Sequence, residues 1–436
     1  MKKFHLAQET VRNYFKSNFH LYFSEIRLSQ MDVENPVEFV GPGELVLDNG
    51  WLKFKVFHKN VGDESARHNA NSRLGVAGQL VPADKYYSLN AVDARGVVWF
   101  SSSLDVSMEM SQEVSVLTAR TMELKCEDVE VVGLESAVTY YVGDSLFTGR
   151  SGGLPTTGFE EDIGNGFKAS VSPDYEFGVV SLTKEGVERS DGEALLRSLE
   201  IMIGKIIQLR CAEFVCDGRY WLELYSLDLG LPNEYVNPPV AINSTFQYES
   251  LVLLLKSLFD FMRAEGEEFH DYWLKIQRAW QTGIDNFALR TAVSIEGVLK
   301  QYFLQFGRDL VFKGIAAEAK ASIAGLNLDV RVLDYLNNSL NGAGTFSARS
   351  ALRELVKRKD IEPGMLKKWS ELRNKSAHAD KLDPKKTQEL LDLTFTNLKL
   401  FYDLLVILID YHGSKTDYSV RGFPSYVGRA LKVSVP

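Results

Sequence analysis

The spacing of apolar residues changes near residue 231 of this 436-residue chain, and this change constrains the fold more than any other feature. Before it, apolar residues occur in short stretches rich in Val, Phe, Tyr and Thr that Gly, Asp and Asn separate, which is typical of β-strands. Beyond it, apolar residues recur every three or four positions, as in amphipathic helices. The segment between them, Leu231 to Ser244, holds three prolines and three asparagines, which interrupt helices and central strands. We therefore predict an α+β protein with a β-rich domain at residues 1–235 and an all-helical domain at residues 245–436.

The first domain is predicted to be a sandwich or a barrel-like fold. Its strand-like segments are Glu44–Val56, Val97–Phe100, Val114–Leu124 and Val129–Val142. Within the first of them, Asp48-Asn49-Gly50 indicates a hairpin, because Asn and Gly tolerate the positive φ angles of a type I′ turn. Residues Ser190–Arg210 differ, since Leu and Ile recur there at helical spacing, and we expect an amphipathic helix that lies over the sheet.

The second domain is predicted to be a helical bundle. Five segments place apolar residues at helical spacing: Leu251–Met262, Trp280–Phe303, Phe312–Ile323, Val330–Leu340 and Ser347–Lys357. A further helix has clearer ends, with Asp383 as the N-cap and Pro384 as the first helical residue. We expect Gly413 to mark the end of this helix, because glycine is common just past helix C-termini.

Composition is typical of a folded soluble protein. The N-terminus has two lysines but no apolar run behind them, so it does not resemble a secretory signal. The longest apolar run, Leu404–Ile409, is far shorter than the roughly 20 residues that span a bilayer. Three cysteines are too few for a disulfide framework, and Cys211 and Cys216 lack the further Cys or His pair that zinc needs. We predict a cytoplasmic protein that has no metal or other cofactor and does not contact a membrane.

Charge is distributed unevenly along the chain. The formal net charge is −9, which argues against a surface that is basic throughout and binds nucleic acid non-specifically. From Arg349 to Lys386, however, there are twelve Lys or Arg and six Asp or Glu, a local balance of +6, so the rest of the chain carries −15. A solvated helix face is one interpretation of this basic segment, and a nucleic-acid contact is the other.

One candidate catalytic motif lies inside the basic segment, between one predicted helix and the capped helix that follows. Phosphate-loop, HExxH and GxSxG signatures are absent, and only His378 among the seven histidines has suitable neighbours. Arg373 and Asn374 precede it in the stretch LRNKSAH. Leu372 and Ala377 can face the bundle, while Asn374 and His378, four residues apart, share another face. The motif therefore brings a permanent cation, an amide and a titratable imidazole to a basic surface.

These groups are the ones that RNA cleavage without a metal requires. An imidazole can accept the proton of a 2′-hydroxyl or donate one to the leaving 5′-oxygen, and a guanidinium can stabilise the phosphate charge. We predict Arg373, Asn374 and His378 as catalytic residues, with RNA-binding contributions from Lys367, Lys368 and Lys375. The structural alternative is that Arg373 pairs with a nearby acid such as Asp380 and that His378 caps the helix C-terminus.

The motif resembles that of the HEPN superfamily, in which an Arg and a polar residue are followed a few positions later by His. More narrowly, the segment is similar to the ApeA-like HEPN group, whose motif has the form LRN-x-x-AH before a long apolar helix. The tail Tyr411–Ser419 and the earlier segment Phe287–Phe303, with Glu296 inside its apolar pattern, also resemble that group. The resemblance covers about 150 residues at the C-terminal end.

The resemblance implies a homodimer whose two motifs form one composite site. It also implies a metal-independent endoribonuclease that produces a 2′,3′-cyclic phosphate and a 5′-hydroxyl from RNA, with tRNA among the candidate substrates. Many members of the family are toxins or abortive-infection effectors in prokaryotic defence against phage. In such proteins an attached domain senses a phage-derived trigger, and we expect the β-rich domain to be the sensor or regulator.

Two alternatives remain open. The helical domain would in one case be a non-catalytic HEPN module that binds nucleotide or dimerises within a larger assembly. In the other case the β-rich domain would bind carbohydrate or protein, and its partner would be inert. The latter requires a cluster of exposed aromatic residues, for which Trp51, Trp99 and Trp221 are the candidates, although core positions are the commoner place for tryptophan.

Overall fold

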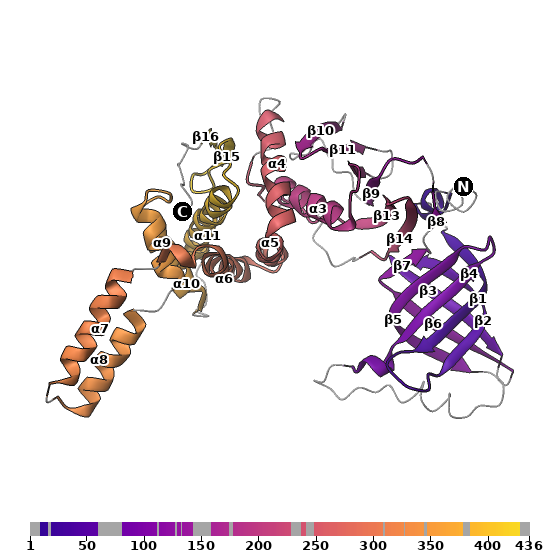
Figure 1. Cartoon of the computed structure of the whole chain (residues 1–436), viewed down its shortest axis with the longest axis horizontal. Helices are drawn as coiled ribbons and strands as arrows, with labels where there is room; N and C mark the ends of the chain where they lie inside the picture. The colour runs from indigo at the N-terminus through magenta and orange to yellow at the C-terminus, as the bar shows by residue number, and fades with distance from the viewer. Residues whose placement is uncertain are drawn as a thin grey trace. The chain divides into compact units, whose positions relative to one another are not determined.

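The fold was analysed in a computed structural model of the whole chain, and it has the predicted α+β layout, with a β-rich part followed by a helical part (Figure 1). The structure describes residues 9–15, 19–59, 81–110, 113–126, 129–131, 133–142, 158–173, 178–227, 237–240, 248–307, 310–326, 328–343, 347–377 and 384–427. The chain divides into two compact units. The N-terminal unit consists of Met1–Leu196 and Ile207–Leu231, and the helical unit consists of Arg197–Ile206 and Pro232–Pro436.

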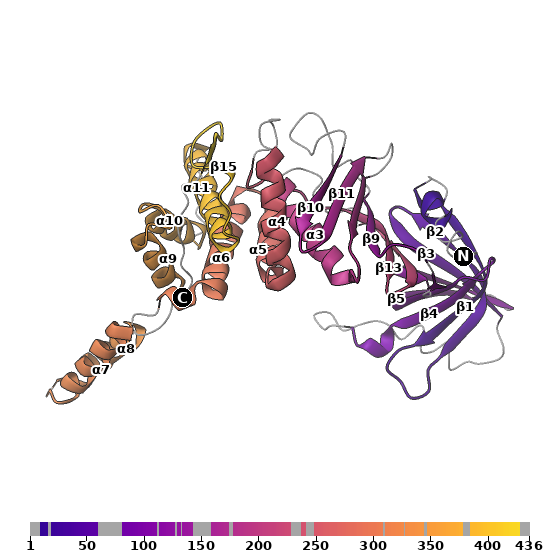
Figure 2. The same cartoon turned by 45° about the horizontal axis from the view of Figure 1, so that its top comes forward.

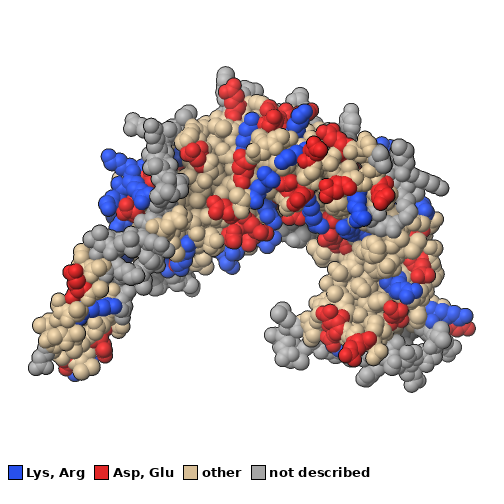
Figure 3. Space-filling view, viewed as in Figure 1, with Lys and Arg blue, Asp and Glu red and all other residues tan. Residues whose placement is uncertain are grey.

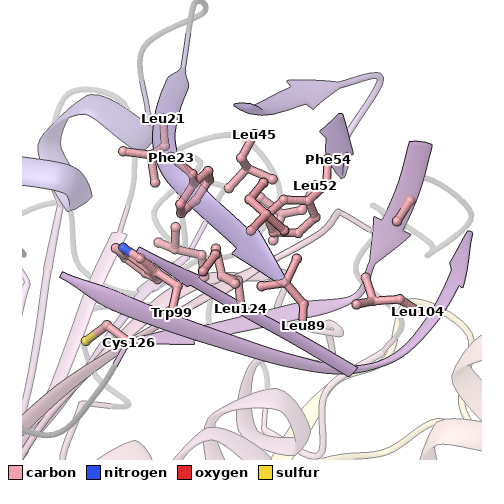
Figure 4. Close-up of a cluster of buried hydrophobic side chains, with 14 of the residues drawn as sticks. Leu21, Phe23, Leu45, Leu52, Phe54, Leu89, Trp99, Leu104, Leu124 and Cys126 are labelled. Carbon is pink, nitrogen blue, oxygen red and sulfur yellow. The ribbon is translucent and has the colours of Figure 1, made fainter. Parts of the chain in front are cut away.

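Six strands of the N-terminal unit form a closed barrel. They are β1 (His20–Gln30), β2 (Glu38–Asp48), β3 (Trp51–Lys59), β4 (Tyr87–Asp93), β5 (Val98–Met110) and β6 (Val114–Thr121). Neighbouring strands pair in the order β5-β4-β1-β2-β3-β6, and β6 pairs with β5 to close the ring. Alternate side chains point inward and form a packed apolar core, part of which Figure 4 shows, with Phe23, Phe54 and Trp99 among its large members.

The hairpin between β2 and β3 has the predicted turn. Asp48 lies opposite Trp51 in the register, so Asn49 and Gly50 alone connect the strands. Their φ angles are 49° and 82°, which a type I′ turn requires at both central positions. The sequence signal at this turn is therefore confirmed.

A second group of strands continues from the barrel. The order from β5 is β7 (Glu123–Cys126), β14 (Arg219–Tyr225), β13 (Leu209–Cys216), β9 (Ala137–Val142), β12 (Gly178–Thr183), β11 (Phe167–Pro173) and β10 (Phe159–Gly164). The short β8 (Val129–Glu130) pairs with β14 beside this path. All these pairings are antiparallel, so the unit has the β-rich, barrel-like character that the sequence predicts.

Helix α3 (Arg189–Ile203) covers part of this second group of strands. A Cβ atom added at Gly192 would meet Val138 and Tyr140 of β9 at 2.5 Å, so the helix approaches the strand closely there. The predicted helix Ser190–Arg210 runs too far, because Gly204 has a φ of 69° and β13 begins at Leu209.

The division between the units falls inside α3. Its first half belongs to the N-terminal unit, and Arg197–Ile206 belongs to the helical unit. In the helical unit, Arg197 pairs with Glu267 at 3.2 Å and Glu200 lies 2.6 Å from His270. These contacts explain why the second half of α3 belongs with the helices, a detail that a single boundary at residues 231–244 does not include.

The helical unit contains eight longer helices in its described residues. They are α4 (Tyr248–Ala264), α5 (Glu267–Trp280), α6 (Ile284–Tyr302), α7 (Leu310–Ala324), α8 (Val330–Ala343), α9 (Ala348–Lys357), α10 (Met365–Ala377) and α11 (Pro384–Leu408), with the 3₁₀ turn η3 (Leu304–Gly307) after α6. The predicted helix Trp280–Phe303 is wrong at its start, because Trp280 ends α5 and Gly283, with a φ of 115°, separates α5 from α6. Helix α6 packs against α5, α9, α10 and α11 and is the centre of the bundle, whereas α7 and α8 pair with each other (Figure 2).

The last helix ends before the predicted stop. Asp410 takes the left-handed conformation, with a φ of 48°, and the Tyr411 amide donates a hydrogen bond to the Val406 carbonyl at 3.1 Å. This pattern satisfies carbonyls at the helix end, so α11 stops just before the left-handed Asp410, and Gly413 lies beyond it. A small hairpin of β15 (Ser414–Thr416) and β16 (Ser425–Val427) follows. The predicted N-cap, Asp383, lies outside the described residues.

None of the helices in the described part of the chain combines the length and the apolar character that a membrane crossing requires.

Candidate functional site

Helix α10 carries the first part of the predicted motif and is fixed by its buried face. Met365, Trp369 and Leu372 follow one another at helical spacing, and each is at most 2% exposed. The Trp369 indole donates a hydrogen bond to the Ala292 carbonyl of α6 at 3.1 Å. Leu372 belongs to a small apolar cluster that also contains Ala288 and Ala292. The backbone just before Arg373 is therefore held firmly against α6.

Arg373 points from α10 toward α6. Its guanidinium lies over the ring of Trp369, 5.9 Å from the ring centroid, and its Nε is 3.0 Å from Oε2 of Glu296. Ala292 and Glu296 are one turn apart on α6, just as Trp369 and Arg373 are one turn apart on α10. The two contacts between the helices are therefore also one turn apart. The same carboxylate has Lys300 at 2.7 Å through its other oxygen. Glu296 is thus shared by two cations, which leaves this small group with a positive balance.

The ion pair is partly exposed to solvent. The Arg373 side chain is 54% exposed and the Glu296 side chain is 18% exposed. The structure therefore provides Arg373 with an acidic partner from another helix. Asp380, the partner considered from the sequence, lies outside the described residues.

Asn374 and His378 are described to different extents. Asn374 is exposed on α10, as the motif predicts, and Leu372 is buried. His378 follows directly after the last residue of α10, Ala377, and lies outside the described residues, so its place relative to Arg373 stays a prediction.

The three lysines predicted to bind RNA do not form one cluster. All three are exposed on α10. Lys367 is seven residues before Asn374 and shares its face of the helix, whereas Lys368 and Lys375, also seven apart, share a different face. Lys375 additionally pairs with Glu371 at 2.8 Å. If RNA passes Asn374, Lys367 is the lysine best placed to contact it.

An exposed apolar stripe lies next to the ion pair on α6. Leu289 and Val293 are 38% and 48% exposed, although most apolar residues of α6 are buried. They are four residues apart, and Glu296 follows three residues later, so all three lie along one side of the helix. These two side chains give the surface beside the ion pair an apolar part.

The other groups that could carry chemistry are metal-ligating side chains and the three cysteine thiols. Among the described residues, no group of three or more His, Cys, Asp or Glu is placed to hold a metal ion. The three cysteines are buried as free thiols, and burial raises the pKa of the Cys211 thiol well above its ordinary value. Thiols of this kind are inert at neutral pH because the thiolate is disfavoured.

The candidate aromatic surface of the β-rich domain is not a cluster. Trp99 is fully buried in the barrel core. Trp221 of β14 is half-buried and stacks on Phe214, with their ring centroids 4.8 Å apart, and Trp51 of β3 is half-buried beneath Arg120. These three tryptophans therefore do not support the carbohydrate-binding alternative.

The contact between Glu296 and Arg373 is the part of the site that the sequence did not predict. The sequence placed Glu296 within an apolar helical pattern and Arg373 in the motif, but 77 positions separate the two residues. A charged residue within an otherwise apolar helix face is the only local sign of such a contact.

No protein-family profile matches this chain, and no curated protein or solved structure is significantly similar to it. The function must therefore be argued from the residues of the site.

Proposed function

We propose that the chain is a metal-independent endoribonuclease of the HEPN type, with Arg373, Asn374 and His378 as its catalytic residues. The observation that carries the proposal is the position of Arg373, which is half-exposed at the end of a well-packed helix and held by Glu296 and the Trp369 ring. A guanidinium fixed in this way is ready to bind a phosphate without reorganisation. His378 follows it by five positions, the spacing of the motif.

In the proposed reaction, a neutral imidazole of His378 takes the proton from the 2′-hydroxyl of one nucleotide. The 2′-oxygen attacks the adjacent phosphorus, and the bond from phosphorus to the 5′-oxygen of the next nucleotide breaks. A protonated imidazole gives a proton to that oxygen, so the products are a 2′,3′-cyclic phosphate and a 5′-hydroxyl. Arg373 stabilises the additional negative charge on the phosphate, and Asn374 positions the reacting groups.

The proposed enzyme is a homodimer. One imidazole cannot easily act as base and as acid on opposite sides of the same phosphate, and a two-fold axis would supply a second copy of the motif. The exposed residues Leu289 and Val293 support this arrangement, since they provide an apolar surface beside Glu296.

The proposed biological role is that of a toxin-like effector in prokaryotic defence against phage. RNA, with tRNA among the candidates, would be the substrate, and the N-terminal unit would hold the nuclease at a low basal activity until a phage-derived trigger binds. The proposal includes a cytoplasmic location.

The second candidate is a non-catalytic HEPN module that binds nucleotide or dimerises within a larger assembly. The ion pair between Arg373 and Glu296 favours this second candidate. An arginine that already has a carboxylate partner can have a purely structural role and needs no substrate phosphate.

Growth after induced expression in a bacterial host separates the two candidates. The native chain should stop growth and degrade RNA, while Arg373→Ala and His378→Ala should each restore growth at the same protein level. Arg331→Ala, which removes an exposed arginine from α8, is the matched control and should remain toxic. Normal growth with intact RNA for the native chain, also in the presence of phage, would favour the non-catalytic module.

A further inference from the structure

Helix α9 carries a stripe of positive charge that the packing of the bundle does not use. Arg349, Arg353 and Lys357 are four residues apart and therefore lie along one face of the helix; we call them the α9 stripe. All three are exposed. The opposite side of α9 is buried in the bundle through Ala348, Ala351, Leu352 and Leu355. Figure 3 shows Lys and Arg side chains gathered over α9.

Helix stability does not explain the first two residues of the stripe. Cations four residues apart repel each other, and Arg349 lies in the first helical turn, where the positive end of the helix dipole disfavours a cation. No acidic residue offsets it in that turn. By contrast, Lys357 and Arg358 lie at the C-terminal end, which favours cations, and each is 3.5 Å from Glu354.

The cations at the two ends of α9 also differ in whether they have acidic partners. In the part of the chain that the structure describes, Lys357 and Arg358 pair with Glu354, but no ion pair joins Arg349 or Arg353 to a carboxylate. The N-terminal half of the stripe is thus destabilising for the helix and uncompensated, which points to a ligand outside the chain.

We infer that the α9 stripe binds the backbone phosphates of single-stranded RNA beside the candidate site. Arg349 and Arg353 present planar guanidinium groups that suit bidentate phosphate contacts. Helix α9 packs against α6 and α10, the helices that carry Glu296 and Arg373, so a strand on α9 lies on an element adjacent to the site. This inference rests on the proposed function for its choice of RNA, and it adds residues that the motif does not contain.

RNA fits the stripe better than a membrane or an acidic protein does. A helix that binds a membrane surface inserts an apolar face, and the apolar face of α9 is already buried against the bundle. The three cations of the α9 stripe are spaced evenly, one helical turn apart, which suits a polymer with evenly spaced negative charges. An acidic protein surface seldom has such regularity.

The test measures binding of the full chain to a short, fluorescent, single-stranded 2′-O-methyl RNA, which lacks the 2′-hydroxyl and cannot be cleaved. Fluorescence anisotropy is recorded for the native chain and for Arg349→Ala/Arg353→Ala. The matched control is Lys275→Ala/Arg278→Ala, which removes the same charge from exposed positions on α5. Cleavage of ordinary RNA is measured in parallel for all three proteins.

The α9 double variant should bind about tenfold more weakly, and the slope of log affinity against log salt should fall by about 1.4, since each phosphate contact to a single strand contributes about 0.7. The control should change neither value substantially. Equal weakening in both variants, or unchanged binding in the α9 variant, would overturn the inference, as would binding of phosphatidylserine vesicles in place of RNA. If the α9 double variant binds RNA normally and the native chain cleaves RNA, the inference about the stripe is wrong but the proposed nuclease stands. If binding depends on the stripe but no protein cleaves RNA, the proposed nuclease is wrong but the binding surface stands.

Discussion

Two ion pairs of nearly equal geometry have different surroundings in the two units. In the N-terminal unit, Arg189 Nη1 lies 2.9 Å from Glu223 Oε1, and in the helical unit Arg373 Nε lies 3.0 Å from Glu296 Oε2. The Glu223 side chain is fully buried and also accepts hydrogen bonds from Trp221 and Tyr225. Glu296 is partly exposed, and its further partner is the exposed cation of Lys300.

The difference concerns what each arginine stabilises. A buried carboxylate is costly unless its partners remain in place, so Arg189 supports the fold of the N-terminal unit. A half-exposed pair contributes little to stability, because water screens both charges. Stability therefore does not explain the position of Arg373, which points to a functional role. Removing each arginine in turn tests whether the two ion pairs differ in this way.

The largest effect is expected for the motif itself. Arg373→Ala and His378→Ala should each lower the rate of RNA cleavage by at least about 100-fold, the low end for loss of an acid–base group or of a charge-stabilising donor. Both variants should stay folded, with thermal unfolding midpoints within about 4 °C of the native value, which separates a catalytic loss from a folding loss. A cleavage rate near that of the native chain in either variant would remove that residue from the catalytic assignment.

The next effect concerns the fold. Arg189→Ala should lower the free energy of unfolding by about 2 kcal/mol, because the buried Glu223 loses a cationic partner and keeps the neutral donors Trp221 and Tyr225. Arg373→Ala, the matched change at the other pair, should lower it by less than about 1 kcal/mol. Urea denaturation of both full-length variants measures the two values, and equal losses would mean that the pairs have the same structural role.

Glu296 should act by positioning Arg373. Glu296→Gln keeps the size of the side chain but removes its charge, and we expect kcat to fall about tenfold with a smaller change in KM, since a misplaced guanidinium weakens transition-state binding. A Glu296→Gln variant with unchanged kcat would show that Arg373 needs no orientation by α6.

Asn374→Ala should lower kcat by a similar factor, because an amide positions groups and transfers no proton. A loss as large as that of His378→Ala would indicate that Asn374 does more than position the other groups.

The smallest effect is a pH dependence in the N-terminal unit. Burial, and then the negative charge of Glu223, raise the pKa of Glu123 above its ordinary value. A raised carboxyl pKa means that the folded state holds the proton more tightly, so this group destabilises the fold once pH exceeds the folded pKa, and the penalty disappears below the unfolded value near 4.5.

Glu123→Gln should accordingly stabilise the chain at pH 7 by less than about 1 kcal/mol, because water screens a half-buried group. Near pH 4 the variant and the native chain should unfold alike. Glu160→Gln, at an exposed position on β10, is the control. A stabilisation that is the same at both pH values would refute the electrostatic explanation.

The sequence predicted local features of the fold better than contacts between distant segments. The change in the spacing of apolar residues predicted the two parts of the chain, and Asn49-Gly50 predicted the hairpin. Both signals depend only on residues that are close in the sequence. Barrel closure by β5 and β6 was not specified, since strand pairing depends on partners outside each segment. The end of α3 was missed because Ile206 and Ile207, which follow the helix, are also buried and continue its apolar spacing.

The same distinction applies to the candidate site. The motif is local, so Arg373, Asn374 and His378 could be singled out by spacing and chemistry. The pairing of Arg373 with Glu296 joins α10 to α6 and becomes visible only when the helices pack. The two faces of α10 that separate Lys367 from Lys368 and Lys375 follow from helical geometry, but their importance depends on which face lies toward Arg373.

The homodimer can be tested by mixing two inactive variants. Arg373→Ala and His378→Ala chains should together regain some cleavage if each composite site uses residues of both copies, and Val293→Asp should weaken both dimerisation and cleavage. A strict monomer in sedimentation at tens of micromolar that still cleaves RNA would rule out the composite site.

The proposed nuclease is tested most directly by cleavage of total RNA and tRNA by the purified chain in EDTA, with the ends of the products analysed. The proposed mechanism predicts cleavage without added metal, 2′,3′-cyclic phosphate and 5′-hydroxyl ends, and no cleavage by His378→Ala under the same conditions. Cleavage that is lost in EDTA and restored by Mg²⁺, or activity that survives in His378→Ala, would contradict it.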